Sequence, residues 1–193
     1  MDSFLKAHGV FLDLTLRDVQ KDTDAALAPM TVVVADSSPL NSLTLIGSVD
    51  VLRRLYGTVI VPQQVITELT DPAAPDEVRG WALNLPDWID VRVAVVNDTS
   101  MLHLDPGERA AITLAQSEPD ALLLIDEAAG RIDSSRRGIL NTGTLGVLRA
   151  AALRELLDLP TALRRLVETN FRVSMELVSA LLAEDAERRR PTE

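Results

Sequence analysis

Four acidic side chains, Asp36, Glu68, Glu108 and Asp126, have the types and spacing needed to hold a divalent metal ion together. Carboxylates gathered at one place would repel one another, because like charges within about 4–6 Å raise each other's pKa. A Mg²⁺ or Mn²⁺ ion would remove that repulsion, since hard cations prefer oxygen ligands. Such an ion could turn water into a nucleophile and neutralise the charge that develops on a phosphodiester.

Two of these acids also have a simple structural explanation. Asp36 precedes two serines and a proline at the start of an apolar helical pattern, and Asp is a common N-cap residue. Glu108 lies three residues after Asp105, with Pro106 at the first helical position, which is the spacing of a capping box. A helix cap and a metal ligand are therefore both open interpretations of Asp36 and of Glu108.

The strands expected to position these acids are short and apolar. Residues 31–35 and 121–125 form almost continuous apolar runs, which is typical of strands buried on both faces of a parallel sheet. Asp36 and Asp126 follow these runs directly. Because neighbouring parallel strands lie about 5 Å apart and end on the same side, both carboxylates could share one rim of the sheet. Further strands are expected at 58–61, at 88–93 as an edge strand, and at 138–141.

Helical patterns separate the strands, at 42–46, 49–55, 63–69, 77–84, 109–116, 147–157, 160–169 and 174–190. This alternation predicts an α/β fold, a three-layer sandwich around a central and mostly parallel sheet, with helical extensions at both ends. We divide the chain into an N-terminal helical extension (1–30), a core (31–150) and C-terminal helices packed on that core (151–193). The extension is expected to hold a short helix, a turn at Gly9, a second short helix and a linker at 28–30.

Composition narrows the chemistry further. The chain of 193 residues has no cysteine and only two histidines, which excludes disulfides and thiolate metal sites and disfavours a zinc site of the usual kind. The net charge of −10 counts against a general nucleic-acid-binding protein but not against a nuclease, whose acidic cluster adds to the negative charge. Because no apolar run reaches membrane-spanning length and no signal pattern begins the chain, we expect a cytoplasmic protein without a membrane partner.

Five motifs taken in order carry a resemblance to a known family. They lie at residues 33–40, 60–68, 104–112, 124–127 and 142–148. In this order they resemble the PIN-domain nucleases, most closely the VapC-like toxins of prokaryotic toxin–antitoxin pairs, over residues 31–182. The resemblance implies a parallel sheet flanked by helices, four acids that hold Mg²⁺ or Mn²⁺, and endonucleolytic cleavage of RNA. It also implies a homodimer and inhibition by a cognate antitoxin protein that occupies the site.

Carried over residue by residue, the resemblance gives each of the four acids a role. Asp36 and Asp126 would be the principal metal ligands, and Glu108 would support them directly or through water. Glu68 would fill the remaining acidic position and orient water or a second metal ion. All four acids are thus predicted to be catalytic residues, three of them as metal ligands.

Three other residues are predicted to meet the substrate. Ser38 follows the first acid, and Thr144 would hydrogen-bond either an acid or the scissile phosphate. Arg131 follows the last acid by about a helical turn and could contact an RNA phosphate, although a surface salt bridge would explain it equally well. Glu127 stands where many relatives carry a second Asp, and its longer side chain could either reach the site or point away.

Two functional interpretations follow. The first is a Mg²⁺-dependent endoribonuclease that acts as the toxin of a toxin–antitoxin pair. The second is a catalytically weak PIN-like module that binds RNA or a protein without cutting, which the net charge and the additional N-terminal residues favour. Residues 3–13 faintly resemble the carboxyl-terminal part of small antitoxins, so the extension at 1–30 could be an antitoxin-like remnant that packs on its own core.

Overall fold

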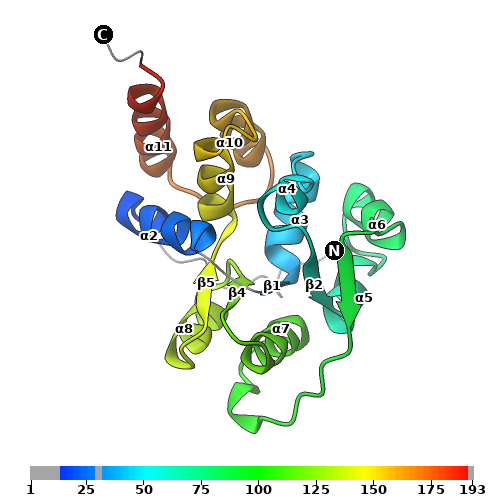
Figure 1. Cartoon of the computed structure of the whole chain (residues 1–193). Helices are drawn as coiled ribbons and strands as arrows, with labels where there is room; N and C mark the ends of the chain where they lie inside the picture. Colours follow the sequence, from blue (N-terminus) through cyan, green and yellow to red (C-terminus); the bar gives the residue numbers. More distant parts are fainter. Residues whose placement is uncertain (1–13, 29–31, 191–193) are drawn as a thin grey trace.

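A five-stranded sheet lies at the centre of the computed structural model, which describes residues 14–28 and 32–190 (Figure 1). Its strands are β1 (Val32–Ala35), β2 (Val59–Pro62), β3 (Ile89–Arg92), β4 (Ala121–Leu124) and β5 (Leu140–Thr142), in the spatial order β3-β2-β1-β4-β5. Central β1 pairs with β2 and β4, so that Val34 lies opposite Ile60 and Leu123. The predicted α/β class is confirmed, and the sheet is parallel throughout rather than mostly parallel.

Helices connect the strands and cover both faces of the sheet. They are α2 (Leu16–Leu27), α3 (Ser37–Leu45), α4 (Val51–Tyr56), α5 (Gln63–Leu69), α6 (Asp76–Leu83), the 3₁₀ turn η1 (Thr99–Met101), α7 (Pro106–Ser117), α8 (Ala128–Arg136), α9 (Thr144–Leu153), α10 (Leu159–Val167) and α11 (Met175–Arg188). In Figure 1, α3, α4 and α9 lie on one side of the strands, and α7 and α8 lie on the other. None of the helices in the described ranges is both long and apolar enough to cross a bilayer.

The strand side chains alternate between two apolar clusters, one on each face of the sheet. Val33 belongs to the larger cluster, which includes Leu40 of α3 and extends to α9, α10 and α11. Val34, the next residue of β1, belongs to the second cluster together with Ile112 of α7. Successive side chains of a strand point to opposite faces of the sheet. Because both faces are covered, the strand is apolar at every position, which explains the continuous apolar runs in the sequence.

The last strand begins two residues later than its expected range of 138–141. Helix α8 ends in a left-handed turn at Gly138, whose φ is +75°, and the N–H of Ile139 still donates to the carbonyl of Ser134 at 3.0 Å. These residues close the helix and are not available to pair with β4. Pairing starts at Leu140, which lies opposite Leu122.

Helix α2 is the described part of the N-terminal extension. It begins with a capping box made by Thr15 and Asp18, and it packs against α9 and beside β5. A Cβ built on Gly146 of α9 would lie 2.7 Å from the Cβ of Asp22, so this glycine permits the close approach of the two helices. The expected first helix and the turn at Gly9 lie outside the described residues. The division at residues 30 and 150 stays a prediction.

Candidate metal centre

The carboxyl ends of β1 and β4 bring two of the predicted acids to one rim of the sheet. Ala35 lies opposite Leu124 in the register of these strands, and Asp36 follows with its N–H donating to the carbonyl of Leu124 at 2.9 Å. Asp126 lies two residues beyond β4, after Ile125. Asp36 is 1% exposed and Asp126 is 6% exposed, so both carboxyl groups are buried at this rim.

Three acids at this rim lie close enough together that they could hold one metal ion. Asp36, Glu68 of α5 and Asp105 each offer one carboxylate oxygen, and these oxygens lie within 4.8 Å of one another. Among the described residues, Oδ1 of Asp36 has no hydrogen-bond partner, which is costly for an oxygen that is removed from water. Three oxygen donors and one unsatisfied buried oxygen fit a hard divalent cation such as Mg²⁺ or Mn²⁺. Asp36 occupies the N-cap position of α3, but in the described part of the chain its side chain makes no capping hydrogen bond.

Glu108 supports Asp105 through two hydrogen bonds. The N–H of Glu108 donates to Oδ1 of Asp105 at 2.8 Å, and Oε2 of Glu108 accepts from the N–H of Asp105 at 3.1 Å. The capping-box interpretation of Glu108 is therefore confirmed. The same helix start also holds Glu68, whose Oε1 accepts from the N–H of Gly107 at 2.8 Å. One turn of α7 thus fixes the side chains of three acids.

A serine connects Asp36 with one further carboxylate at the same rim. The hydroxyl of Ser38 lies 2.6 Å from Oε2 of Glu127 and 3.3 Å from Oδ2 of Asp36. Glu127 is 5% exposed, so its side chain points into the site rather than away from it. A single hydroxyl proton can serve only one of the two acceptors at a time, and the shorter contact is to Glu127. Ser38 is therefore engaged by acids, whereas its predicted contact with substrate stays a prediction.

Asp126 is held by the start of α9. The N–H of Thr144 donates to Oδ1 of Asp126 at 2.7 Å, and the Thr144 hydroxyl donates to Oδ2 at 2.6 Å. The structure thus pairs Thr144 with an acid, one of the two partners expected for it. Asp126 borders the group of Asp36, Glu68 and Asp105 without being one of its members.

The hydroxyl of Thr144 offers a direct test of this support. Thr144→Val is expected to lower the free energy of unfolding by about 2 kcal/mol, because a buried hydrogen bond to a charged group is lost and its acceptor stays buried. Thr144→Ser keeps the hydroxyl and is the matched control. Urea unfolding followed by circular dichroism measures both, and a loss in Thr144→Ser with none in Thr144→Val would show that the methyl group, not the hydrogen bond, matters.

Arg131 is paired inside the protein. Its Nη2 donates to Oδ1 of Asp22 on α2 at 2.5 Å, and its Nη1 donates to the carbonyl of Ile125 at 3.3 Å. The Arg131 side chain is 11% exposed. The structure therefore contains the alternative that was expected for Arg131, a salt bridge. This salt bridge is buried rather than on the surface.

The crowding of acids changes their protonation. Burial, followed by the charge of Asp105, raises the pKa of Glu68 and of Glu108 to about 7. Burial, followed by the charge of Asp126, raises the pKa of Glu127 to about 8. The pKa of Asp36 is also raised well above its usual range by burial and by the neighbouring Glu127 carboxyl. Each group therefore gains from binding a proton or a cation near neutral pH.

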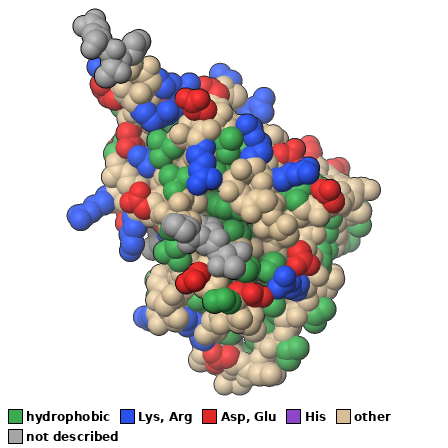
Figure 2. Space-filling model, in the orientation of Figure 1, with side chains coloured by type: hydrophobic (Ala, Val, Ile, Leu, Met, Phe, Trp, Pro, Cys, Tyr) green, Lys and Arg blue, Asp and Glu red, His purple; other side chains and the backbone are tan. Residues whose placement is uncertain are grey.

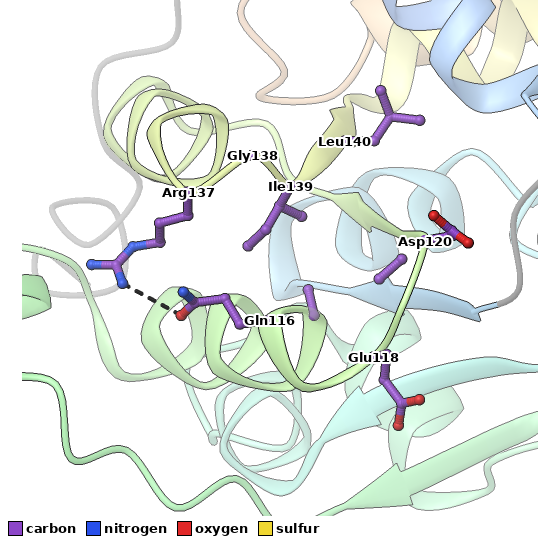
Figure 3. Close-up of a pocket in the computed structure, with 9 residues that line it drawn as sticks. Gln116, Glu118, Asp120, Arg137, Gly138, Ile139 and Leu140 are labelled. Carbon is purple, nitrogen blue, oxygen red and sulfur yellow. Dashed lines mark hydrogen bonds between the residues drawn. The ribbon is translucent and has the colours of Figure 1, made fainter.

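A separate cavity of about 360 Å³ lies at the other end of the sheet (Figure 3). It is lined by Asp120, which precedes β4, and by Leu140, which begins β5, so it opens at the amino ends of these strands. Arg137 lines it and donates to Gln116 at 3.4 Å, while the same guanidinium is held by Asp98 and Asp133. The acids at the carboxyl ends of the strands remain the candidate site.

Sequence reasoning missed two residues of this site. The sequence predicts Asp105 only as a helix cap, although the capping-box spacing that indicates Glu108 also places the Asp105 carboxylate at the same helix start. No feature of the sequence indicates Asp22 as a residue of the site, because its place beside Arg131 depends on how α2 packs against α9. The structure brings Asp36 and Glu68 together as expected and adds Asp105 to them.

Comparison with known proteins gives one match. The family model DUF3368, described as a PIN domain, matches residues 32–187. Neither the curated proteins nor the solved structures contain a protein that matches this chain. The family model covers most of the chain, from β1 into α11, and includes every acid of the candidate metal centre. The chain therefore belongs to the PIN-domain family.

Proposed function

We propose that this protein is a Mg²⁺- or Mn²⁺-dependent endoribonuclease and the toxin of a toxin–antitoxin pair. PIN domains are generally nucleases that depend on divalent metal ions, which supports the phosphodiesterase part of the proposal. The observation that carries it is the unsatisfied Oδ1 of Asp36, which lies buried in a group of three acids with ligand spacing. The resemblance of the five sequence motifs to VapC-like toxins supports RNA as the substrate and the toxin role.

Some residues of the site would bind the metal ion, and others would hold those ligands in place. Asp36, Glu68 and Asp105 would hold the ion, and Asp126 would complete the acidic rim. When bound, the ion supplies an activated water and neutralises charge on the phosphodiester. Glu108 fixes Asp105 through the capping box. These contacts keep the acids in place before substrate arrives, so little reorganisation is needed for catalysis.

Other supporting contacts hold the remaining acids at the rim. Thr144 fixes both oxygens of Asp126. Ser38 keeps the Glu127 carboxyl beside Asp36, where it can accept a proton. Protonation of Glu127 is favoured near neutral pH because burial raises its pKa to about 8. A carboxyl with a pKa in this range exchanges its proton readily near neutral pH, and only its ionised form could accept a proton from water.

The partners belong to the same proposal. They are an RNA substrate, a cognate antitoxin protein and a second copy of the chain in a homodimer, acting in the cytoplasm. On the face shown in Figure 2, Lys and Arg side chains are mixed with Asp and Glu side chains rather than gathered in one basic surface. RNA recognition would then depend on a few local contacts, and because few phosphates would be neutralised, binding would weaken only gradually with salt.

The second candidate is a catalytically weak module that binds RNA or protein through the same fold. The observation that favours it is the buried pairing of Arg131 with Asp22, which removes one cation from the reach of a substrate phosphate. The net charge of −10 points the same way. Such a module would bind its partner equally well with and without a divalent ion.

The test is cleavage of a fluorescent single-stranded RNA with Mg²⁺, with Mn²⁺ and with chelator. We expect cleavage with either ion and none with chelator. Glu68→Gln should reduce the rate about a hundredfold, because a ligand charge is lost, whereas Glu77→Gln, a change at an exposed acid of α6, should leave it unchanged. Binding without cleavage at every metal concentration would favour the second candidate, and equal cleavage in chelator would contradict metal dependence.

A further inference from the structure

Asp22 occupies a place that is built to bind an anion. Its carboxylate accepts from Nη2 of Arg131 at 2.5 Å and from the backbone N–H of Gly143 at 3.3 Å. Gly143 is the N-cap residue of α9, so the carboxylate also lies at the positive end of a ten-residue helix. A guanidinium, a backbone N–H and a helix start are the groups that bind phosphate in many proteins.

This anion position borders the candidate metal centre. A Cβ built on Gly143 would lie 2.6 Å from Oδ1 of Asp126 and 3.1 Å from Nη1 of Arg131, so these two atoms flank the same point. Arg131 and Asp22 also both contribute to the electrostatic environment of the Asp126 carboxyl. An anion bound by Arg131 would therefore lie next to the acidic rim, where the proposed function places the backbone of a substrate RNA.

A groove leads from the surface to the same pair of residues. It lies between α2, α8 and β5 and has a volume of about 910 Å³. Asp22 and Arg131 are part of its lining, and Lys21, Arg136 and Asn141 add further hydrogen-bond donors. Asp18 and Asp24 of α2 line it as well, so every acid in the lining comes from α2. The groove gives an anion from solvent a path to the guanidinium of Arg131.

A phosphodiester could take the place of the Asp22 carboxylate without changing the local charge. A phosphodiester carries one negative charge and two unesterified oxygens, as a carboxylate carries one charge and two oxygens. Replacing the Asp22 carboxylate by a backbone phosphate would therefore keep the charge of Arg131 neutralised and give its Nη2 another oxygen acceptor. The residue that would have to withdraw belongs to α2, which precedes the part of the chain that the family model matches.

We propose that Arg131, the N–H of Gly143 and the start of α9 form a phosphate subsite for the nucleic-acid backbone, and that Asp22 is a built-in competitor for it. The choice of an RNA phosphate as the ligand rests on the proposed function, whereas the anion subsite itself does not. Helix α2 would then set how readily substrate binds. Arg131 would contact substrate only after the Asp22 carboxylate has left.

The anion subsite is tested with inorganic phosphate and Asp22→Ala. In this variant the guanidinium loses its partner, so we expect a lower melting temperature that phosphate restores. The apparent Kd for phosphate should be about tenfold lower than for the wild type, since the competing carboxylate no longer occupies the site. The double variant Asp22→Ala/Arg131→Gln is the matched control, and it also corrects for the general stabilisation of proteins by phosphate. Equal effects of phosphate in the single and double variants would overturn the subsite.

Asp22→Asn serves if the Ala variant does not fold, because it keeps the size of the side chain and removes its charge. The effect of phosphate on Asp22→Asn is then compared with its effect on Asp22→Asn/Arg131→Gln, and equal effects would overturn the subsite. Circular dichroism confirms that each variant has the wild-type helix content before phosphate is added.

The place of the subsite on the substrate path is tested with a short fluorescent single-stranded RNA, bound in chelator and followed by anisotropy. Asp22→Asn should bind it several-fold more tightly than the wild type, and Asp22→Asn/Arg131→Gln should not. If phosphate restores the melting temperature of the Asp22 variant but that variant binds RNA no more tightly than the wild type, the role of the subsite in substrate binding is overturned. Failure of metal-dependent cleavage in the wild type would contradict the proposed function and leave the phosphate result intact.

Discussion

Asp36→Asn is expected to reduce metal-dependent RNA cleavage by about a thousandfold, because charge stabilisation by a bound ion contributes several kcal/mol to such reactions. Asp36 is the member of the three-acid group that is almost fully buried, and its Oδ1 has no hydrogen-bond partner within the described ranges. An amide at this position cannot contribute the negative charge that the ion needs. The measurement is the rate of cleavage under saturating Mn²⁺, together with Mn²⁺ affinity by calorimetry.

The same variant should fold at least as stably as the wild type when no metal is present. Burial and the nearby acids make the charged form of Asp36 unfavourable, so a neutral amide of the same shape relieves repulsion. Asp87→Asn, at a surface position whose side chain is 84% exposed, is the matched control and should change neither property. A variant that keeps cleavage, or that loses it only by unfolding, would contradict the role of Asp36 as a ligand.

Without metal, the protein is expected to lose stability as the pH rises from about 5 to 8. The pKa values of Glu68 and Glu108 are raised to about 7 and that of Glu127 to about 8, whereas unfolded glutamates titrate near 4.3. Between these values the folded state binds more protons than the unfolded state. The free energy of unfolding therefore falls with pH, by about 1.4 kcal/mol per pH unit for each carboxyl that behaves in this way.

Adding Mg²⁺ or Mn²⁺ should reverse this trend. The ion binds carboxylates that have lost their protons, so the rise in melting temperature caused by metal should grow from pH 6 to pH 8. Thermal unfolding over this pH range, in chelator and with a large excess of metal over protein, measures how the melting temperature depends on pH in each condition. A metal-free stability that increases over this pH range would show that the acids are ionised and paired in the folded protein.

The architecture could be predicted because its signals are local. Apolar runs at 31–35 and 121–125 indicated buried parallel strands, and these strands indicated where Asp36 and Asp126 would lie. Helix-start chemistry indicated Asp105 and Glu108, whose reciprocal hydrogen bonds are formed as expected. In each case the information was contained in fewer than ten consecutive residues.

The detailed division of roles in the site could not be predicted, because it depends on contacts between distant segments. Ser38 meets Glu127 across 89 residues of sequence, and Arg131 meets Asp22 across 109 residues. No local pattern distinguishes a carboxylate that lies among other acids, as Asp36 does, from one that is bound by Thr144, as Asp126 is. The start of β5 was misplaced for a local reason, since the left-handed turn at Gly138 extends the end of α8.

The position of β1 at the centre of the sheet has a consequence for the growing polypeptide on the ribosome. Both neighbours of β1 come later in the chain, and β4 is added only when residues 121–124 have been made. Asp36 is synthesised early, but Asp105 and Glu127 can join it only after residue 127 of the 193 residues has been made. A chain that has not yet reached β4 therefore has no complete acidic rim, so the candidate metal centre can form only after β1 and β4 have paired.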